Sequence, residues 1–401
     1  MSDDIQVPIK NKFIAEVRLR GFDYIPKEEE IITYDNVIVE LDLSNKDGFY
    51  SKNPKLANFK FDLISIPNLE ILNISYHHLR KFDVSIWSLT TLKSFISREN
   101  FITTIDKGIR NLTQLAQLDL YQSQIYHLPP EIKHLIKLRE LNLAENMIIE
   151  YPDEINSLTN LSILDLAGNR ITTISDGICH LTKLTYLNLF NNQLNDLPES
   201  IGLLVNIERF YLSENKLKQI PNSICNLSNL TILLLSGNNL QSLPQNFGNI
   251  YNLRELFISN NQLTSLPNSF GNLSNIKIVS IGENLFTEFP SSILELMSLE
   301  SLNLDGNQIS SIPNDIYRLD NLKYLYLRNN NITTLPETIG YLSGLIELEL
   351  NHNNLYSLPK SISSLTNLQT LNLTNNRNLI FQDWVNDWLN LLQKNGCKIS
   401  I

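Results

Sequence analysis

Cysteine and long apolar runs are both scarce in this sequence. Only three of its 401 residues are cysteine, and no stretch of eighteen consecutive apolar residues occurs. The second absence argues against a transmembrane helix, which needs about 20 apolar residues in a row. The N-terminal segment MSDDIQVPIKNK also has no apolar core, so we expect no secretory signal.

Basic residues are outnumbered by acidic ones. The 32 lysines and arginines face 42 aspartates and glutamates, which leaves a net charge of −10. Phosphate binding needs a basic stripe, so we predict that nucleic acid is not a partner.

Motifs of catalysis and metal binding are also missing. The six histidines show no metal-ligand spacing with cysteines or carboxylates. No G-x-x-x-x-G-K-[ST] phosphate loop occurs, and no nucleophile can be matched with a base and an orienting group. We therefore predict a protein that is not an enzyme and has no cofactor or metal site.

What the sequence has instead is a period of 23 residues. The phrase LTYLNLFNNQLNDLPESIGLLVN, residues 184–206, is one of thirteen copies that fill residues 69–367 without insertion. Their common pattern, L-x-x-L-x-L-x-x-N-x-L, is the signature of leucine-rich repeats. The copies begin at Leu69, Leu92, Leu115, Leu138, Leu161, Leu184, Ile207, Leu230, Leu253, Ile276, Leu299, Leu322 and Leu345.

Each copy predicts a short strand. Leu187 and Leu189 alternate with Tyr186, Asn188 and Phe190, which is the period-2 pattern of a strand with one buried face. Stacked copies place these strands in parallel. The expected fold class is α/β: a right-handed leucine-rich-repeat solenoid, or horseshoe, with a parallel concave sheet and short helical or 3-10 turns on the convex side.

An asparagine at the position of Asn192 recurs in nearly every copy. We interpret it as a ladder of buried amides that bond to backbone groups where the chain turns into the core. His77 and Ser123 interrupt this ladder, so we expect local irregularity in their coils.

We expect one elongated domain in three parts. Residues 1–68 hold divergent N-terminal repeats or a cap, with a longer loop at 44–62 whose alternative role is to dock a partner. Residues 69–367 are the thirteen regular repeats. Residues 368–401 hold the last strand, a capping helix and an edge strand.

The cysteines are consistent with a reducing compartment. Cys179 and Cys225 occupy the same place in copies two repeats apart, which is about 10 Å at the usual strand spacing. A disulfide needs Cα atoms within about 7 Å. We therefore expect free thiols and a cytoplasmic protein.

The form of the repeat also carries a resemblance. Segments such as NNQLNDLPESIGLL and NNNITTLPETIGYL resemble intracellular leucine-rich repeat proteins of the Ras-suppressor, scribble and plant Ras-group kind. The coil is similar as well to that of disease-resistance-type and bacterial repeat proteins. The resemblance implies a non-catalytic scaffold that binds a small GTPase or another signalling protein on its concave face.

The outward side chains of the sheet give the candidate site. The early strands carry ordinary residues such as Asn73, Arg98, Asp119 and Asn142. Larger residues follow, and we predict two partner-binding clusters, the second beside Glu347, Glu349 and His352. The first holds Tyr186, Phe190, Arg209, Tyr211, Ile232, Leu234, Phe257 and Ile278, and the second holds Tyr324, Tyr326 and Arg328.

Two interpretations of these clusters stay open. The aromatic and aliphatic side chains either bind a partner or form a cross-strand ladder that stabilises the sheet. Glu347 and Glu349 do not suggest a glycosidase, because an open sheet lacks the closed cleft that such a pair needs.

The sequence therefore predicts a monomeric cytoplasmic scaffold with a protein partner and no membrane insertion. The alternative is a secreted or surface-exposed microbial adhesion or effector protein that binds host molecules.

Overall fold

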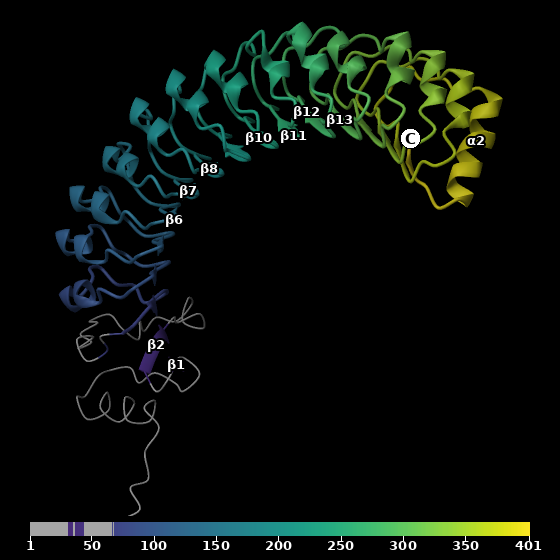
Figure 1. Ribbon diagram of the computed structural model, residues 1–401. Helices are drawn as coiled ribbons and strands as arrows, with labels where there is room; N and C mark the ends of the chain where they lie inside the picture. The colour runs from purple at the N-terminus through teal and green to yellow at the C-terminus, as the bar shows by residue number, and fades with distance from the viewer. Residues whose placement is uncertain (1–30, 35–36, 44–65, 67) are drawn as a thin grey trace, which may run out of the picture. The chain divides into compact units, whose positions relative to one another are not determined.

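The computed structural model describes residues 31–34, 37–43, 66 and 68–401. The chain divides into an N-terminal unit, residues 1–193, and a C-terminal unit, residues 194–401, which we describe separately. In each unit the strands lie along one side and the 3-10 helices along the other (Figure 1). We call the outward surface of the strands the open face, and the side with the helices the turn face.

The N-terminal unit contains a parallel sheet built from one strand per coil. Strands β2 to β8 pair in sequence order, and partner residues in β3 to β8 are 23 apart, as in Ile163↔Tyr186. The strands are β2 Val37–Asp42, β3 Ile71–Asn73, β4 Ser94–Ile96, β5 Gln117–Asp119, β6 Glu140–Asn142, β7 Ile163–Asp165 and β8 Tyr186–Asn188.

The first strand of this unit was not predicted from the sequence. β1, Ile31–Tyr34, pairs antiparallel with β2, with a register shift between Ile32 and Thr33. The loop at 44–62, and with it the alternative docking role, lies outside the described residues.

The C-terminal unit continues the same plan. Its strands β9 to β17 pair in parallel, again in sequence order. They are β9 Arg209–Tyr211, β10 Ile232–Leu234, β11 Glu255–Phe257, β12 Ile278–Ser280, β13 Ser301–Asn303, β14 Tyr324–Tyr326, β15 Glu347–Glu349, β16 Thr370–Asn372 and β17 Lys398–Ser400.

The last coil ends in helix α2, Asp383–Lys394. Asp383 lies in its first turn and Lys394 in its last, where each charge complements the helix dipole. Gly396 follows with a φ of 88°, as a glycine does just beyond a helix C-terminus. The helix buries Val385, Trp388, Leu389 and Leu392, which cover the final coil.

Short 3-10 helices form the turn face of both units. Most follow a proline, such as Pro198 with a φ of −70°, where no strand requires its missing N–H. They are η4 Val84–Ser88, η5 Lys107–Asn111, η6 Pro130–His134, η7 Asp153–Ser157 and η8 Asp176–His180 in the N-terminal unit; and η9 Glu199–Leu203, η10 Asn222–Asn226, η11 Phe247–Asn249, η12 Asn268–Asn272, η13 Ser291–Glu295, η14 Asn314–Arg318, η15 Glu337–Tyr341 and η16 Lys360–Ser364 in the C-terminal unit.

The asparagine ladder is present and bonds each coil to its neighbours. Asn261 accepts a hydrogen bond from the backbone N–H of Leu240 at 2.9 Å. Its amide nitrogen donates to the carbonyl oxygens of Leu235 at 3.0 Å and Ile258 at 3.2 Å. The side chain is buried, so these bonds satisfy backbone groups that water does not reach.

A longer period of three coils overlies the 23-residue repeat. The residue just before each ladder asparagine has a positive φ. Over nine successive coils, from Glu145 to Asn329, this residue is Glu, Gly and Asn in turn, three times over. Glu145, Glu214 and Glu283 each precede a glycine one coil later, at Gly168, Gly237 and Gly306. A Cβ on any of these glycines would lie 2.3 Å from the preceding glutamate's Oε1, so the glutamate lies over the glycine.

We predict that Asn261→Ala lowers the free energy of unfolding by about 2 to 4 kcal/mol, because it leaves buried donors and acceptors unpaired. Urea unfolding followed by circular dichroism measures the change. Thr264→Ala, at an exposed position of the same coil, is the control and should shift stability by less than about 0.5 kcal/mol. Equal effects of the two substitutions would contradict the role of the ladder.

Candidate functional site

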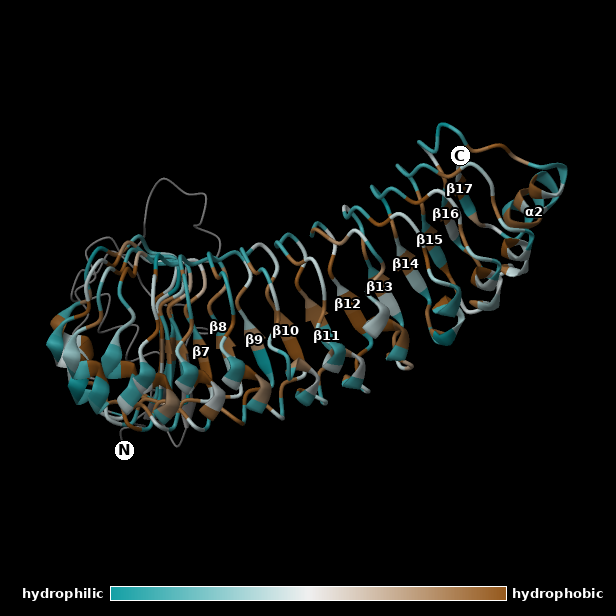
Figure 2. Cartoon of the chain, turned by 90° about the horizontal axis from the view of Figure 1, so that it is seen from above, coloured by the Kyte–Doolittle hydropathy of each residue, from teal (hydrophilic) through white to brown (hydrophobic). Residues whose placement is uncertain are grey.

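The strand register of the C-terminal unit arranges the predicted open-face residues in columns. Tyr211, Leu234 and Phe257 lie side by side on β9, β10 and β11, and we call them the apolar column. All three are half-buried. The hydropathy colouring is brown over β10 and largely teal over β15 (Figure 2), so the strands of this unit differ in their share of apolar residues.

A second column runs parallel to the first and is less uniform than the sequence suggested. Ile232 has Arg209 on one side and Glu255 on the other, and Ile278 comes only after Glu255. The exposed Arg209 and the half-buried Glu255 therefore place one charge of each sign beside Ile232.

The apolar column replaces a hydrogen bond that seven other coils make at the same position. There an asparagine or aspartate accepts the backbone N–H two residues later, as Asn142 does from Ala144 at 3.0 Å and Asn303 from Asp305 at 2.8 Å. Similar bonds are made by Asn73, Asp119, Asp165, Asn188 and Asn372. The side chains of the apolar column cannot make this bond. The need to pair that backbone N–H therefore does not explain why these residues are present.

Tyr186 and Phe190 belong to the N-terminal unit, where their surroundings are polar. The Tyr186 hydroxyl accepts from the amide of Asn188 at 3.1 Å, and the same amide donates to Asp165, also at 3.1 Å. Burial raises the pKa of Asp165, although bonds from the Ala167 N–H and from Asn188 oppose the rise. Tyr186 thus joins a polar network, while Phe190 is exposed.

The early strands are not ordinary, and on this point the sequence interpretation was wrong. Arg98 approaches Asp119 through Nε at 2.7 Å and Nη2 at 2.6 Å, and the Asp119 side chain is only 3% exposed. Gln117 donates to Glu140 at 3.0 Å. These groups line a hollow of about 160 Å³ on the open face. The ion pair joins residues 21 apart, an offset that a search confined to the 23-residue period overlooks.

Strand register brings the tyrosines of the second predicted cluster beside its glutamates. Tyr324 pairs with Glu347 and Tyr326 with Glu349 across β14 and β15. The Tyr326 hydroxyl donates to Glu347 Oε2 at 3.0 Å. Burial and this carboxylate raise the pKa of Tyr326 to about 12, so its hydroxyl stays protonated. His352 contacts Asn375 rather than the tyrosines.

Asp305 is a member of this cluster that sequence reasoning missed. Its carboxylate accepts from the backbone N–H of Arg328 at 2.6 Å and lies 3.6 Å from that guanidinium. Burial raises the pKa of Asp305 to about 6, and the charges of Glu349 and Glu283 add to the rise while Arg328 opposes it. The cluster is therefore rich in hydrogen-bond acceptors, and one of its carboxyls has a pKa of about 6.

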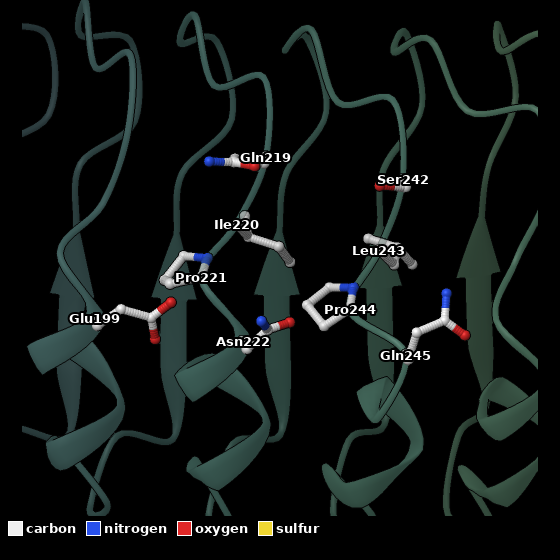
Figure 3. A pocket seen from close by; sticks show the side chains of 9 residues that line it. All are labelled: Glu199, Gln219, Ile220, Pro221, Asn222, Ser242, Leu243, Pro244 and Gln245. Atoms are coloured by element: carbon white, nitrogen blue, oxygen red, sulfur yellow. The ribbon is translucent and has the colours of Figure 1, made fainter.

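A further hollow, of about 360 Å³, lies on the turn face of the C-terminal unit. Figure 3 shows Pro221 and Pro244 at matching places on adjacent coils, with Glu199 to one side. Glu199 accepts from the backbone N–H of Ser223 at 3.1 Å. Since this hollow repeats the spacing of the coils and contains no histidine or cysteine, we assign it a structural origin.

Neither metal ligands nor a membrane span is found in the part of the chain that the structure describes. No group of three or more His, Cys, Asp and Glu side chains there could hold a metal ion. No helix among those residues is long and apolar enough to cross a membrane. All three cysteines are free thiols.

The buried carboxyl of Asp305 gives a pH prediction. Its pKa is higher in the folded protein than the ordinary 3.8. Between about pH 4 and pH 6 this carboxyl is therefore protonated in the folded protein but ionised in the unfolded chain, and the free energy of unfolding falls as pH rises through this range. Asp305→Asn keeps an acceptor for the Arg328 N–H but removes the charge. It should raise the free energy of unfolding at pH 7 by about 1 to 3 kcal/mol and have little effect at pH 4.

Urea unfolding at the two pH values measures this difference. Asp196→Asn, which changes an exposed carboxylate of the same unit, is the control. Parallel pH profiles for wild type and Asp305→Asn would contradict the prediction.

Comparison with protein families and known structures adds to this geometry. A model of the leucine-rich repeat region matches residues 175–259. A second model, leucine rich repeat, matches residues 136–194 and overlapping segments at 251–309, 274–332, 297–342 and 320–377. A search of curated proteins gave no match.

Several solved structures are similar. A leucine-rich repeat protein of Leptospira interrogans is 29% identical with a TM-score of 0.67, and the match covers 88% of this chain and 98% of that one. The plant peptide hormone receptor RGFR1, in complex with RGF2, is 25% identical with a TM-score of 0.62, over 86% of this chain and 67% of that one. An internalin of Listeria monocytogenes is 25% identical with a TM-score of 0.57, over 70% and 86%.

The repeat, the coil-to-coil asparagine bonds and these matches agree. The chain belongs to the leucine-rich repeat proteins and folds as a leucine-rich-repeat solenoid.

Proposed function

We propose that this protein is a non-catalytic scaffold that binds a protein partner through the open face of its C-terminal unit. The apolar column of Tyr211, Leu234 and Phe257 carries the proposal. At this position seven other coils use asparagine or aspartate to bond their own backbone, and here that bond is given up for large half-buried side chains. Large aromatic and aliphatic side chains are typical anchors of protein interfaces.

The charges beside the column favour a protein or peptide partner over a lipid or a simple apolar molecule. Arg209 and Glu255 flank Ile232, so an apolar centre has a polar edge carrying both signs. Such an edge is usual in transient protein interfaces. The likeness to RGFR1 in complex with RGF2 supports a protein or peptide ligand in general.

The identity and location of the partner belong to the proposal as well. The resemblance of the coil to Ras-related repeat proteins favours a small GTPase or another cytoplasmic signalling protein, bound by a monomer on the concave face. The likeness to proteins of Leptospira and Listeria favours the alternative, a secreted or surface-exposed microbial protein that binds host molecules.

We predict that Tyr211→Ala/Phe257→Ala abolishes partner binding while the protein stays folded. Truncating two anchor residues should weaken affinity by at least about 100-fold. Affinity capture from the source organism's cytosol, followed by mass spectrometry, compares this variant with wild type. A partner present only in the culture supernatant or on host cells would instead favour the secreted alternative.

The matched control is Tyr317→Ala/Tyr341→Ala, which removes two exposed aromatic residues from the turn face of the same unit. It should retain the partner. A partner held equally by wild type and Tyr211→Ala/Phe257→Ala would refute the apolar column as the site. A large loss of thermal stability in the latter variant would favour the cross-strand ladder.

Tyr326→Ala/Arg328→Ala separates the second cluster from the first. Unchanged binding by this variant would remove the cluster from the proposed interface, whereas a loss equal to that of the apolar-column variant would extend the interface to β14.

A further inference from the structure

A hollow of about 370 Å³ lies beside the sheet of the N-terminal unit, where the chain leaves the strands. It is separate from the open-face columns described above. Four successive coils contribute to its lining, which includes His78, Glu99, Phe101, Ser123 and Met147. Its volume is enough for a small organic group.

The hollow lies at a break in the asparagine ladder. Where the ladder is intact, Asn146 accepts from the Ile125 N–H at 3.0 Å and donates to the Leu120 carbonyl at 2.9 Å. Ser123 stands at the equivalent place one coil earlier, and its side chain is too short for both bonds. The residue is 7% exposed, and its Oγ has no hydrogen-bond partner.

The strands do not close this gap. β4, β5 and β6 keep the regular parallel register on both sides of Ser123, so the spacing of the coils is unchanged. The irregularity predicted for this coil is therefore confined to its side chains, and the backbone does not move in to close the hollow.

Glu99 supplies a second unpartnered polar atom. Its Oε2 is buried without a hydrogen-bond partner, and burial raises its pKa while the charge of Arg98 opposes the rise. Arg98 is already bonded to Asp119. Glu99 also cannot lie over the next coil as Glu145 does over Gly168, because Gln122 at that place has a Cβ.

One wall of the hollow is flat and aromatic. The rings of His78 and Phe101 stack with centroids 5.0 Å apart and an angle of 22° between their planes. Phe101 is 39% exposed, so its surface is accessible. A planar cation stacks well on such a ring, and an arginine guanidinium does so more often than an ammonium.

We propose that this hollow binds a guanidinium group, stacked on Phe101, with N–H donors directed to the Glu99 carboxylate and the Ser123 hydroxyl. The group would come from an arginine side chain of a protein segment or from a free small guanidinium compound. The proposal concerns a second site on a different surface, and it does not depend on the function of the apolar column.

Two methionines provide a direct measurement. Methyl-labelled Met147 lines the hollow, whereas Met297 of the C-terminal unit is not among its lining residues, so an NMR spectrum contains a reporter and an internal control. Ethylguanidinium, titrated at pH 7.5, should shift the Met147 methyl signal to saturation and leave Met297 unchanged. Ethylurea, which is similar in shape but uncharged, should bind at least about 10-fold more weakly, because it lacks the charge that pairs with Glu99.

Two substitutions test the named contacts. Glu99→Gln preserves shape and removes the charge, and it should weaken ethylguanidinium binding about 10-fold without changing the melting temperature by more than about 2 °C. Ser123→Asn restores the ladder side chain. It should take the space beside the Leu120 carbonyl, weaken ethylguanidinium binding by removing the free hydroxyl, and raise the melting temperature by about 2 to 4 °C.

Other results would overturn the proposal. These are equal binding of ethylurea and ethylguanidinium, a Met147 shift that does not saturate, or binding that Glu99→Gln leaves intact. The capped residue N-acetyl-arginine N-methylamide distinguishes the two sources of the group. Tighter binding than ethylguanidinium indicates an arginine within a protein segment, and weaker binding indicates a free compound.

Discussion

The buried asparagine amide is the interaction on which the rest of this solenoid depends. Each ladder asparagine, such as Asn261, accepts an N–H from the coil before it and donates to carbonyl oxygens on its own and an earlier coil. The chain must leave the sheet at that point, and its backbone groups would otherwise be buried without partners. Because the same bonds form at the same place in nearly every coil, they hold the coils at one spacing and keep the strands in parallel register.

A fold built this way leaves few side chains free for function. Leucines and isoleucines fill the core, asparagines form the ladder, and many open-face residues bond their own backbone, as Asn142 and Asn303 do. The positions that point to function are those where the usual structural residue is replaced by one that cannot do the same work. The apolar column is one case, since it replaces an internal hydrogen bond with accessible apolar surface. Ser123 is another, since a shortened side chain in the ladder leaves a lined space.

The sequence predicted the architecture well because its causes are local and repeated. The alternation around Leu187 predicts a strand, and the apolar stripe around Trp388 predicts the last helix. The site was harder to predict, because a 23-residue period shows which side chains face outward but not which ones meet. The Arg98–Asp119 pair crosses coils at an offset of 21, and Glu255 lies between two isoleucines. The raised pKa of Asp305 depends on burial that only the structure provides.

The glutamates that lie over glycines have a consequence for how such a chain can change in length. Glu145, Glu214 and Glu283 recur 69 residues apart, each followed by glycine in the next coil. Duplicating or deleting a block of three coils in frame therefore keeps each of these glutamates against a glycine. Removing only the coil that carries the glycine would place the glutamate against a residue that has a Cβ, with which it would clash. A change in length that keeps these contacts therefore adds or removes about 14 Å of sheet at a time.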